Sequence, residues 1–333
     1  MKQVETQIVP ASSKEDVLRS VQWANENNVP IYTNEKNLPS DEGIFIDISQ
    51  WPATIDISPD DLTAVVSPSA TPAQINEEAA KHGLMYPPDA RGQKNMIADH
   101  LATNTGGPHE LKYGATKDFV IGLEMVTPEG KPMRTGGRTI KNVTGYDVTK
   151  LIVGAEGAFG FITAATLKLV PKTPARCTLV ATYNDVEDAA RAAANVYGSA
   201  ILPAKLALTA SDELLVALDG HPKTVAAHVQ MVKDMLDDVS MYEDDESLWD
   251  EYRAQKTGID VSVAPSELTS FIEHNREITP FYGHAGSSVW HITVNAESAD
   301  APKTGPAAED IMTAMKKSWD PNNIIQTKAG AER

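Results

Sequence analysis

The sequence lacks the features that mark several classes of protein. It has one cysteine, Cys177, in 333 residues, so no disulfide can form within the chain, which fits a reducing compartment or one of either redox state. It contains no run of 18 uncharged apolar residues, and residues 1–10 hold no apolar signal core. We therefore expect neither a membrane span nor a signal peptide, and a cytoplasmic location. Any membrane contact would go through a partner protein.

Basic charge is also scarce. Lys and Arg number 29 against 46 Asp and Glu, which gives a net charge of −17. A surface this acidic repels polyanions, so nucleic acid and anionic membranes are not expected partners. The ordinary role of such a charge is to keep a protein soluble.

The pattern of apolar residues predicts both helices and strands. The length of the chain allows two or three buried cores. In the first 50 residues, a helix over 12–27 and strands at 29–32 and 43–49 predict a β-α-β-β start. A strand then precedes a helix over 71–83, which Thr71 caps. A hairpin is predicted around Glu129 and Gly130.

The second half of the chain has a different pattern. Residues 175–242 read as strand, helix, strand, strand, helix and strand, the order of a ferredoxin-like layer of helices on an antiparallel sheet. The sequence PKTP at 171–174 suggests a domain boundary before it. The acidic stretch YEDDESLWDEYR that follows is interpreted as a solvated helix face.

Two stretches carry a resemblance to a known family. Residues 104–130, NTGGPHELKYGATKDFVIGLEMVTPEG, and residues 141–172, KNVTGYDVTKLIVGAEGAFGFITAATLKLVPK, closely resemble the FAD-linked oxidases, which include glycolate oxidase and D-lactate dehydrogenase subunits. The sequence DPNNI at 320–324 extends the likeness. It implies an α+β fold with a vanillyl-alcohol-oxidase type flavin domain. This PCMH-type FAD-binding domain would cover 1–172, in two subdomains of about 1–50 and 51–172. A ferredoxin-like cap domain of reduced size and a C-terminal tail would follow over 173–333.

The resemblance implies FAD as the cofactor and a set of residues that line it. Loop amides hold the phosphates in such families, and glycines let the backbone approach the ring closely. The matching positions here are Pro88, Asp89, Asn104, Thr105, Gly106, Gly107, Tyr113, Gly114, Gly154, Glu156, Gly157, Gly160 and Ile162. The resemblance assigns no catalytic residue.

Two phosphate-facing loops depart from the family pattern. A glycine-rich loop of the family is replaced by YTNEKNLPSDEG at 32–43, in which Pro39 supplies no amide N–H. A Ser-Ile-Gly-Gly-Asn segment is replaced by NMIADH at 95–100, so Ala98 and Asp99 stand where the family has two glycines. A carboxylate about 5 Å from a phosphate charge costs about 3 kcal/mol at an effective dielectric of about 20. That is roughly a hundredfold in affinity.

The region that would face the substrate also departs from the family pattern. Residues 281–296, FYGHAGSSVWHITVNA, resemble a family strand that supplies two metal-ligating histidines, and His284 and His291 keep their spacing. The central Asp-Gly-Asn of the family is Ser287, Ser288 and Val289 here, and the later segment that would supply a third ligand is missing. We therefore predict no metal site, with the two histidines as weak candidates.

Two functions stay open from the sequence. The first is an FAD-linked oxidoreductase subunit of a 2-hydroxy acid oxidase or dehydrogenase complex, acting on glycolate or lactate beside a catalytic flavoprotein and an iron–sulfur subunit. The shortened C-terminal region most resembles the accessory FAD-binding subunit of glycolate oxidase. The second is a flavin-less, non-catalytic relative that serves as an assembly or regulatory subunit.

Overall fold

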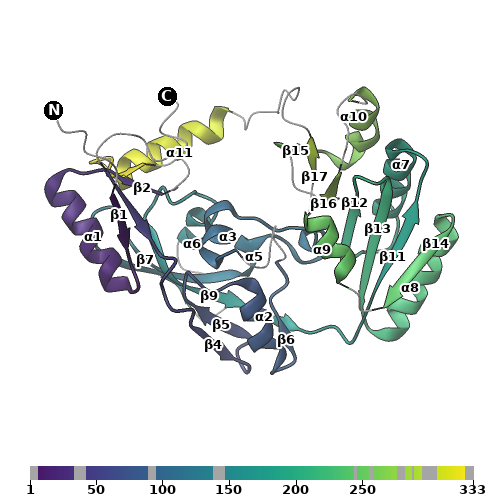
Figure 1. Cartoon of the computed structure of the whole chain (residues 1–333), viewed down its shortest axis with the longest axis horizontal. Helices are drawn as coiled ribbons and strands as arrows, with labels where there is room; N and C mark the ends of the chain where they lie inside the picture. The colour runs from purple at the N-terminus through teal and green to yellow at the C-terminus, as the bar shows by residue number, and fades with distance from the viewer. Residues whose placement is uncertain are drawn as a thin grey trace.

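The computed structural model describes residues 7–33, 43–88, 95–137, 147–243, 246–254, 259–275, 282–286, 289–294 and 306–326. Figure 1 shows two bodies side by side. The first body holds the strands β1 to β10 and also receives the C-terminal strand β18. The second body is built on one seven-stranded sheet made from β11 to β17.

The first sheet of the first body confirms the predicted β-α-β-β start. Its strands are parallel and lie in the order β1 (Gln7–Pro10), β3 (Ile44–Asp47), β2 (Ile31–Tyr32) and β18 (Ile325–Gln326). The helix α1 (Lys14–Asn27) begins where the Ser13 side chain accepts a hydrogen bond from the Asp16 amide, and it ends at Asn28 in the left-handed conformation. Its buried face anchors it to this sheet.

The second sheet of the first body is antiparallel. Its strands are β4 (Ile55–Ser58), β5 (Thr63–Val66), β9 (Phe161–Lys168), β7 (Val120–Val126) and β8 (Pro132–Gly136). The β7–β8 hairpin turns through Gly130 at φ +70°, which confirms the prediction for that turn. The remaining elements are α2 (Pro72–Ala80), β6 (Leu84–Met85), α3 (Ile97–Thr103), α4 (Glu110–Tyr113), α5 (Thr116–Phe119), α6 (Val148–Ile152) and β10 (Val170–Pro171).

The second body contains the predicted ferredoxin-like layer and enlarges it. Strands β14 (Val239–Glu243), β11 (Ala175–Thr182), β13 (Glu213–Gly220) and β12 (Lys205–Leu208) adjoin in that order, joined by α7 (Val186–Tyr197) and α8 (Pro222–Met235). The sheet then continues through β16 (Tyr282–Ala285), β17 (Trp290–Val294) and β15 (Ile259–Val263). Pairing of β12 with β16 therefore adds three strands that the sequence pattern did not reveal.

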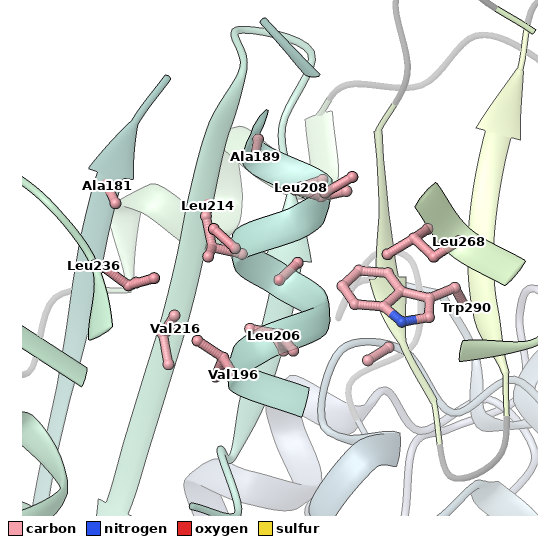
Figure 2. Packing of buried hydrophobic residues seen from close by; sticks show 14 of the residues in the cluster. Ala181, Ala189, Val196, Leu206, Leu208, Leu214, Val216, Leu236, Leu268 and Trp290 are labelled. Atoms are coloured by element: carbon pink, nitrogen blue, oxygen red, sulfur yellow. The ribbon is translucent and has the colours of Figure 1, made fainter. Parts of the chain in front are cut away.

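The two faces of this sheet are covered differently. On one face, Leu206, Leu214 and Val216 pack against Val196 of α7, as Figure 2 shows, and η2 (Pro265–Glu267) and α10 (Leu268–His274) extend the layer towards Trp290. The other face receives α9 (Ser247–Ala254). The acidic stretch predicted to be a solvated helix face therefore also carries buried aromatic side chains into the core.

The C-terminal segment returns to the first body. The helix α11 (Pro306–Trp319) leads to Asp320, which is 3% exposed and accepts hydrogen bonds of 2.9 Å from the amides of Ile324 and Ile325. Lys316 lies 2.6 Å from the same carboxylate. This turn holds β18 beside β2, so the end of the described chain completes the first sheet. No helix within the described residues is long and apolar enough to cross a membrane.

Candidate functional site

The glycine-rich turn before β9 meets two other loops of the first body. The Gly154 amide donates to the Leu101 carbonyl at 2.8 Å, which joins the turn to α3. A Cβ on Gly157, whose φ is +82°, would lie 3.0 Å from the Thr33 Cγ2 atom. The end of β2, the end of α3 and this turn therefore converge, which is where the resemblance places the cofactor.

The loop after α3 offers backbone donors. Gly106 and Gly107 are buried. No described residue accepts a hydrogen bond from the amides of Thr105, Gly106 or Gly107. The Thr105 carbonyl, in contrast, accepts a hydrogen bond of 2.6 Å from the Thr116 hydroxyl. Asn104 orients the loop by accepting a hydrogen bond from the Lys117 amide at 2.8 Å. Because buried amides normally have partners, three consecutive donors fit a bound group that is rich in acceptor atoms.

Packing within the chain also explains why several of the predicted cofactor-binding positions are glycines. A Cβ on Gly106 would lie 2.4 Å from the Glu110 Oε2 atom, one on Gly114 would lie 2.7 Å from Asp118, and one on Gly160 would lie 2.3 Å from a carbonyl oxygen. These contacts would force a shift of the neighbouring atoms. At Gly160 the neighbour is backbone, so close packing requires glycine there whether or not a cofactor is bound, whereas at Gly106 and Gly114 a carboxylate side chain would have to move.

The other predicted positions differ in how far they are exposed. Pro88 is buried, Gly154 and Glu156 are exposed, and Ile162 is half-buried in β9 against the core of the first body. Asp89 lies outside the described residues, as does most of the predicted glycine-poor loop, residues 34–42.

The NMIADH segment forms the start of α3. Asp99 lies in the first turn of this helix. Desolvation raises the pKa of its carboxyl group, opposed by a backbone hydrogen bond at Met96. The Ala98 amide donates to the Pro68 carbonyl at 3.0 Å. The Asp99 amide donates to the Met96 carbonyl at 3.0 Å, so the amides at both replaced glycines bond within the protein.

Tyr113 takes part in a contact between the two bodies. Its hydroxyl donates to Asp219 Oδ2 at 2.6 Å, and Lys112 forms an ion pair with the other oxygen of the same carboxylate. Asp219 is the second-last residue of β13, and its side chain is 8% exposed. Burial, followed by the nearby carboxylate, holds the pKa of Tyr113 far above its usual range. The residue predicted to lie near the flavin ring therefore ties α4 to the second body.

The two candidate histidines lie opposite each other in the second body. His284 of β16 pairs with His291 of β17, and their rings stack with centroids 5.0 Å apart. The Tyr252 hydroxyl lies 3.0 Å from His284 Nδ1, and His291 Nε2 lies 3.5 Å from Glu110 Oε2. Within the described residues, no group of three His, Cys, Asp or Glu side chains is arranged to hold a metal ion.

Sequence reasoning did not single out Glu110, Tyr252 or Asp219. Glu110 lies inside the stretch that carries the resemblance, three residues after Gly107, but its partner His291 is far away in the sequence. No local spacing links such residues. The pairing depends on how the second body packs against α4, which only the tertiary structure shows.

Comparisons with known proteins agree with this architecture. Residues 6–136 match the model of an FAD binding domain. The chain is 34% identical over 220 residues to the glycolate oxidase subunit GlcD of Bacillus subtilis (strain 168), covering 64% of this chain and 47% of that protein. It is 31% identical over 189 residues to the D-lactate dehydrogenase of Archaeoglobus fulgidus, covering 55% of this chain and 42% of that protein.

A solved structure extends the likeness to the whole fold. A crystal structure of p-cresol methylhydroxylase with substrate bound matches with a TM-score of 0.73, over 97% of this chain and 88% of that chain, at 16% sequence identity. The fold is thus a PCMH-type FAD-binding domain followed by a cap.

The matched sequences and the fold together point to the cofactor. The chain contains an FAD binding domain and is similar to FAD-linked oxidases, which supports FAD as its cofactor. It spans about half the length of the curated relatives that it matches. The amides of Thr105, Gly106 and Gly107, which have no acceptor among the described residues, fit FAD, which presents acceptor atoms on its ring system and its phosphates.

Proposed function

We propose that this chain is an FAD-linked oxidoreductase subunit that oxidises a small 2-hydroxy acid, glycolate or lactate. The relatives named as a glycolate oxidase subunit and a D-lactate dehydrogenase support this substrate class. The structural observation that carries the proposal is the pair of His291 and Glu110, 3.5 Å apart. It brings a proton acceptor of the second body next to the loop whose amides fit the cofactor.

Oxidation of a 2-hydroxy acid to a 2-oxo acid removes a proton from the hydroxyl oxygen and a hydride from the carbon that carries it. FAD, when bound, supplies the hydride acceptor. In this proposal His291 takes the hydroxyl proton, and the Glu110 carboxylate stabilises the imidazolium that forms. His284 holds the His291 ring by stacking, and the Tyr252 hydroxyl fixes the position of His284.

The proposal includes the domains and partners that the sequence suggests. Residues 1–172 would form the FAD-binding domain in two subdomains, and residues 173–333 the reduced cap with its tail. The name "subunit" on one relative supports membership of a complex, in which this chain would stand beside a catalytic flavoprotein and an iron–sulfur subunit. The location proposed for this complex is the cytoplasm.

One observation favours the alternative function, a flavin-less assembly or regulatory subunit. Ala98 and Asp99 occupy the first turn of α3, where the family has a glycine pair that faces the phosphates. A carboxylate at that place opposes the binding of a pyrophosphate. This second candidate differs from the first in one measurable property, which is whether the purified chain retains flavin.

The test is a visible absorption spectrum of the purified chain, recorded before and after incubation with FAD, and then with glycolate or D-lactate added without oxygen. We expect a flavin band that the hydroxy acid bleaches. Glu110→Gln should slow the bleaching about a hundredfold, the usual scale of proton-transfer catalysis. Glu129→Gln, on the exposed hairpin, is the control. A flavin band that neither acid bleaches would contradict the proposed substrate class.

A further inference from the structure

The C-terminal segment, residues 306–326, packs on two of the loops that converge at the candidate cofactor site. In the sequence it follows the strands of the second body, but Figure 1 shows its helix α11 lying along the first body. It contains α11, the turn at Asp320 and the strand β18. None of its residues is among the positions predicted to bind FAD, so any effect of this segment on the cofactor would be indirect.

The first contact of this segment is with the glycine-rich turn before β9. The Trp319 ring meets the Phe159 ring edge-on, with centroids 5.7 Å apart and an angle of 66° between the ring planes. Phe159 is 1% exposed and lies between Gly157 and Gly160, two of the predicted FAD-binding positions. Met315, one helical turn before Trp319, packs on the same core cluster as Phe159. Because an edge-to-face pair orients both rings, α11 holds the turn through Phe159.

The second contact is with the end of β2. The Ile31 amide donates to the Ile324 carbonyl at 2.7 Å, and the Thr33 amide donates to the Gln326 carbonyl at 3.3 Å. The Thr33 hydroxyl lies 3.4 Å from the same carbonyl oxygen. Thr33 is the residue that Gly157 approaches from the glycine-rich turn. Strand β18 therefore holds the other side of the approach between these two loops.

The turn at Asp320 joins the two contacts. Asp320 directly follows Trp319, and its carboxylate accepts hydrogen bonds of 2.9 Å from the amides of Ile324 and Ile325. Lys316 of α11 lies 2.6 Å from the same carboxylate. The end of α11 and the start of β18 are thus fixed to one another, so a shift of one contact is passed to the other.

The strand at the end of this segment is suited to open. Within the described residues, β18 is two residues long and lies at the edge of the first sheet. A short edge strand opens more easily than the strands inside a sheet, because few hydrogen bonds oppose its release. Opening would free Thr33 from Gln326 and, through the Asp320 turn, Trp319 from Phe159.

Ordinary packing of the first body accounts for either contact alone, but the two together hold both loops whose spacing matters for the cofactor. We propose that docking of the C-terminal segment shapes the loops that receive FAD, so that docking and FAD binding favour each other. The proposal rests on the FAD binding that the proposed function requires. Trp319 acts in it as a positioning residue, not a catalytic one. A coupling free energy is shared by the two sites, so FAD strengthens docking by the same factor as docking strengthens FAD binding.

Titration of the full chain with FAD, followed by flavin fluorescence, tests one direction of the coupling. Trp319→Ala should weaken FAD binding about tenfold, within the usual range of coupling between two sites. Trp319→Phe keeps an aromatic ring against Phe159 and should restore most of the affinity. Leu18→Ala is the matched control, because Leu18 is half-buried in α1 and packs on a different core cluster of the first body. It should lower the unfolding free energy but leave FAD affinity unchanged.

Hydrogen exchange of the wild-type chain tests the reverse direction and needs no variant. With saturating FAD, the amides of Ile324 and Ile325 should exchange about tenfold more slowly than without it. Exchange that FAD does not slow would overturn the proposal. Equal FAD affinities in Trp319→Ala and Leu18→Ala, or a Trp319→Phe variant as weak as Trp319→Ala, would also overturn it.

These measurements separate the proposal from the proposed function because neither uses a hydroxy acid. A chain that shows the coupling but whose flavin no hydroxy acid bleaches would support the role of the C-terminal segment and contradict only the substrate class. A chain whose flavin is bleached but shows no coupling would contradict only this role. A chain that binds no FAD would overturn both.

Discussion

Gly157 shows how one residue joins the fold to the cofactor. Its backbone has φ +82°, and its Cα hydrogen faces Thr33 at the start of the loop that follows β2. Any side chain at this position is strained, and its Cβ would displace the Thr33 side chain by a few tenths of an ångström. The approach of this turn to the end of β2 therefore depends on the absence of a Cβ at residue 157.

Gly157→Ala should lower FAD affinity at least tenfold by displacing Thr33, and should also lower the unfolding free energy by about 1–2 kcal/mol through the left-handed backbone. Gly83→Ala is the control, since Gly83 has φ +68° with no atom within 4 Å of the added Cβ. The Gly83→Ala variant should lose about as much unfolding free energy as Gly157→Ala but keep its FAD affinity, measured by flavin fluorescence titration. Equal affinities in the two variants would show that the turn does not shape the cofactor site.

Tyr86 gives a prediction for alkaline pH. Complete burial raises its pKa above the usual range, so the folded chain keeps the phenol proton when the unfolded chain loses it. The unfolding free energy should therefore fall as pH rises above about 10, with Tyr86 contributing up to about 1.4 kcal/mol per pH unit. Tyr86→Phe should flatten this slope in urea unfolding at pH values from about 9.5 to 11.5. An unchanged slope would contradict the assignment.

At the scale of elements, local chemistry explains what the sequence could predict. The caps at Ser13 and Thr71, and the turn at Gly130, act within a few residues, so the helices and the hairpin that they define were confirmed. The pairing of β12 with β16 and of β2 with β18 joins distant segments. Short strands of two to five residues carry too little periodicity to reveal such partners.

The return of β18 depends on the buried carboxylate of Asp320. Asp320→Ala should lower the unfolding free energy by about 3 kcal/mol, because it removes two hydrogen bonds to backbone amides and leaves Lys316 without its ion partner. Glu78→Ala, which removes an exposed ion pair with Lys81, should cost less than about 1 kcal/mol. Urea unfolding of both variants gives the comparison, and equal losses would contradict this role for Asp320.

At the scale of the whole molecule, α4 links the two bodies. Lys112 and Tyr113 both bond to Asp219, and Glu110 meets His291. The resemblance predicted the cofactor and the residue types around it, because those lie in contiguous stretches. It did not predict this link, since the partners come from segments that are distant in the sequence and meet only in the tertiary structure.

Asp219→Asn tests whether this link couples the bodies. The change keeps the shape of the side chain but removes the charge that faces Lys112, so it should cost about 3 kcal/mol at the junction. We expect calorimetry to show one unfolding transition in the wild type and two partly separated transitions in the variant. Asp188→Asn, which breaks an exposed pair with Arg191, should leave a single transition. A single transition in Asp219→Asn as well would mean that other contacts couple the bodies.

Whether the chain binds FAD despite Ala98 and Asp99 decides between the two proposed functions. The most direct measurement is the molar ratio of FAD to protein, determined from the flavin released on denaturation after incubation with FAD and removal of the excess. The amides of the 105–107 loop and the convergence of the three loops predict one FAD per chain. A chain that releases no flavin after this treatment would contradict the account and favour the flavin-less alternative.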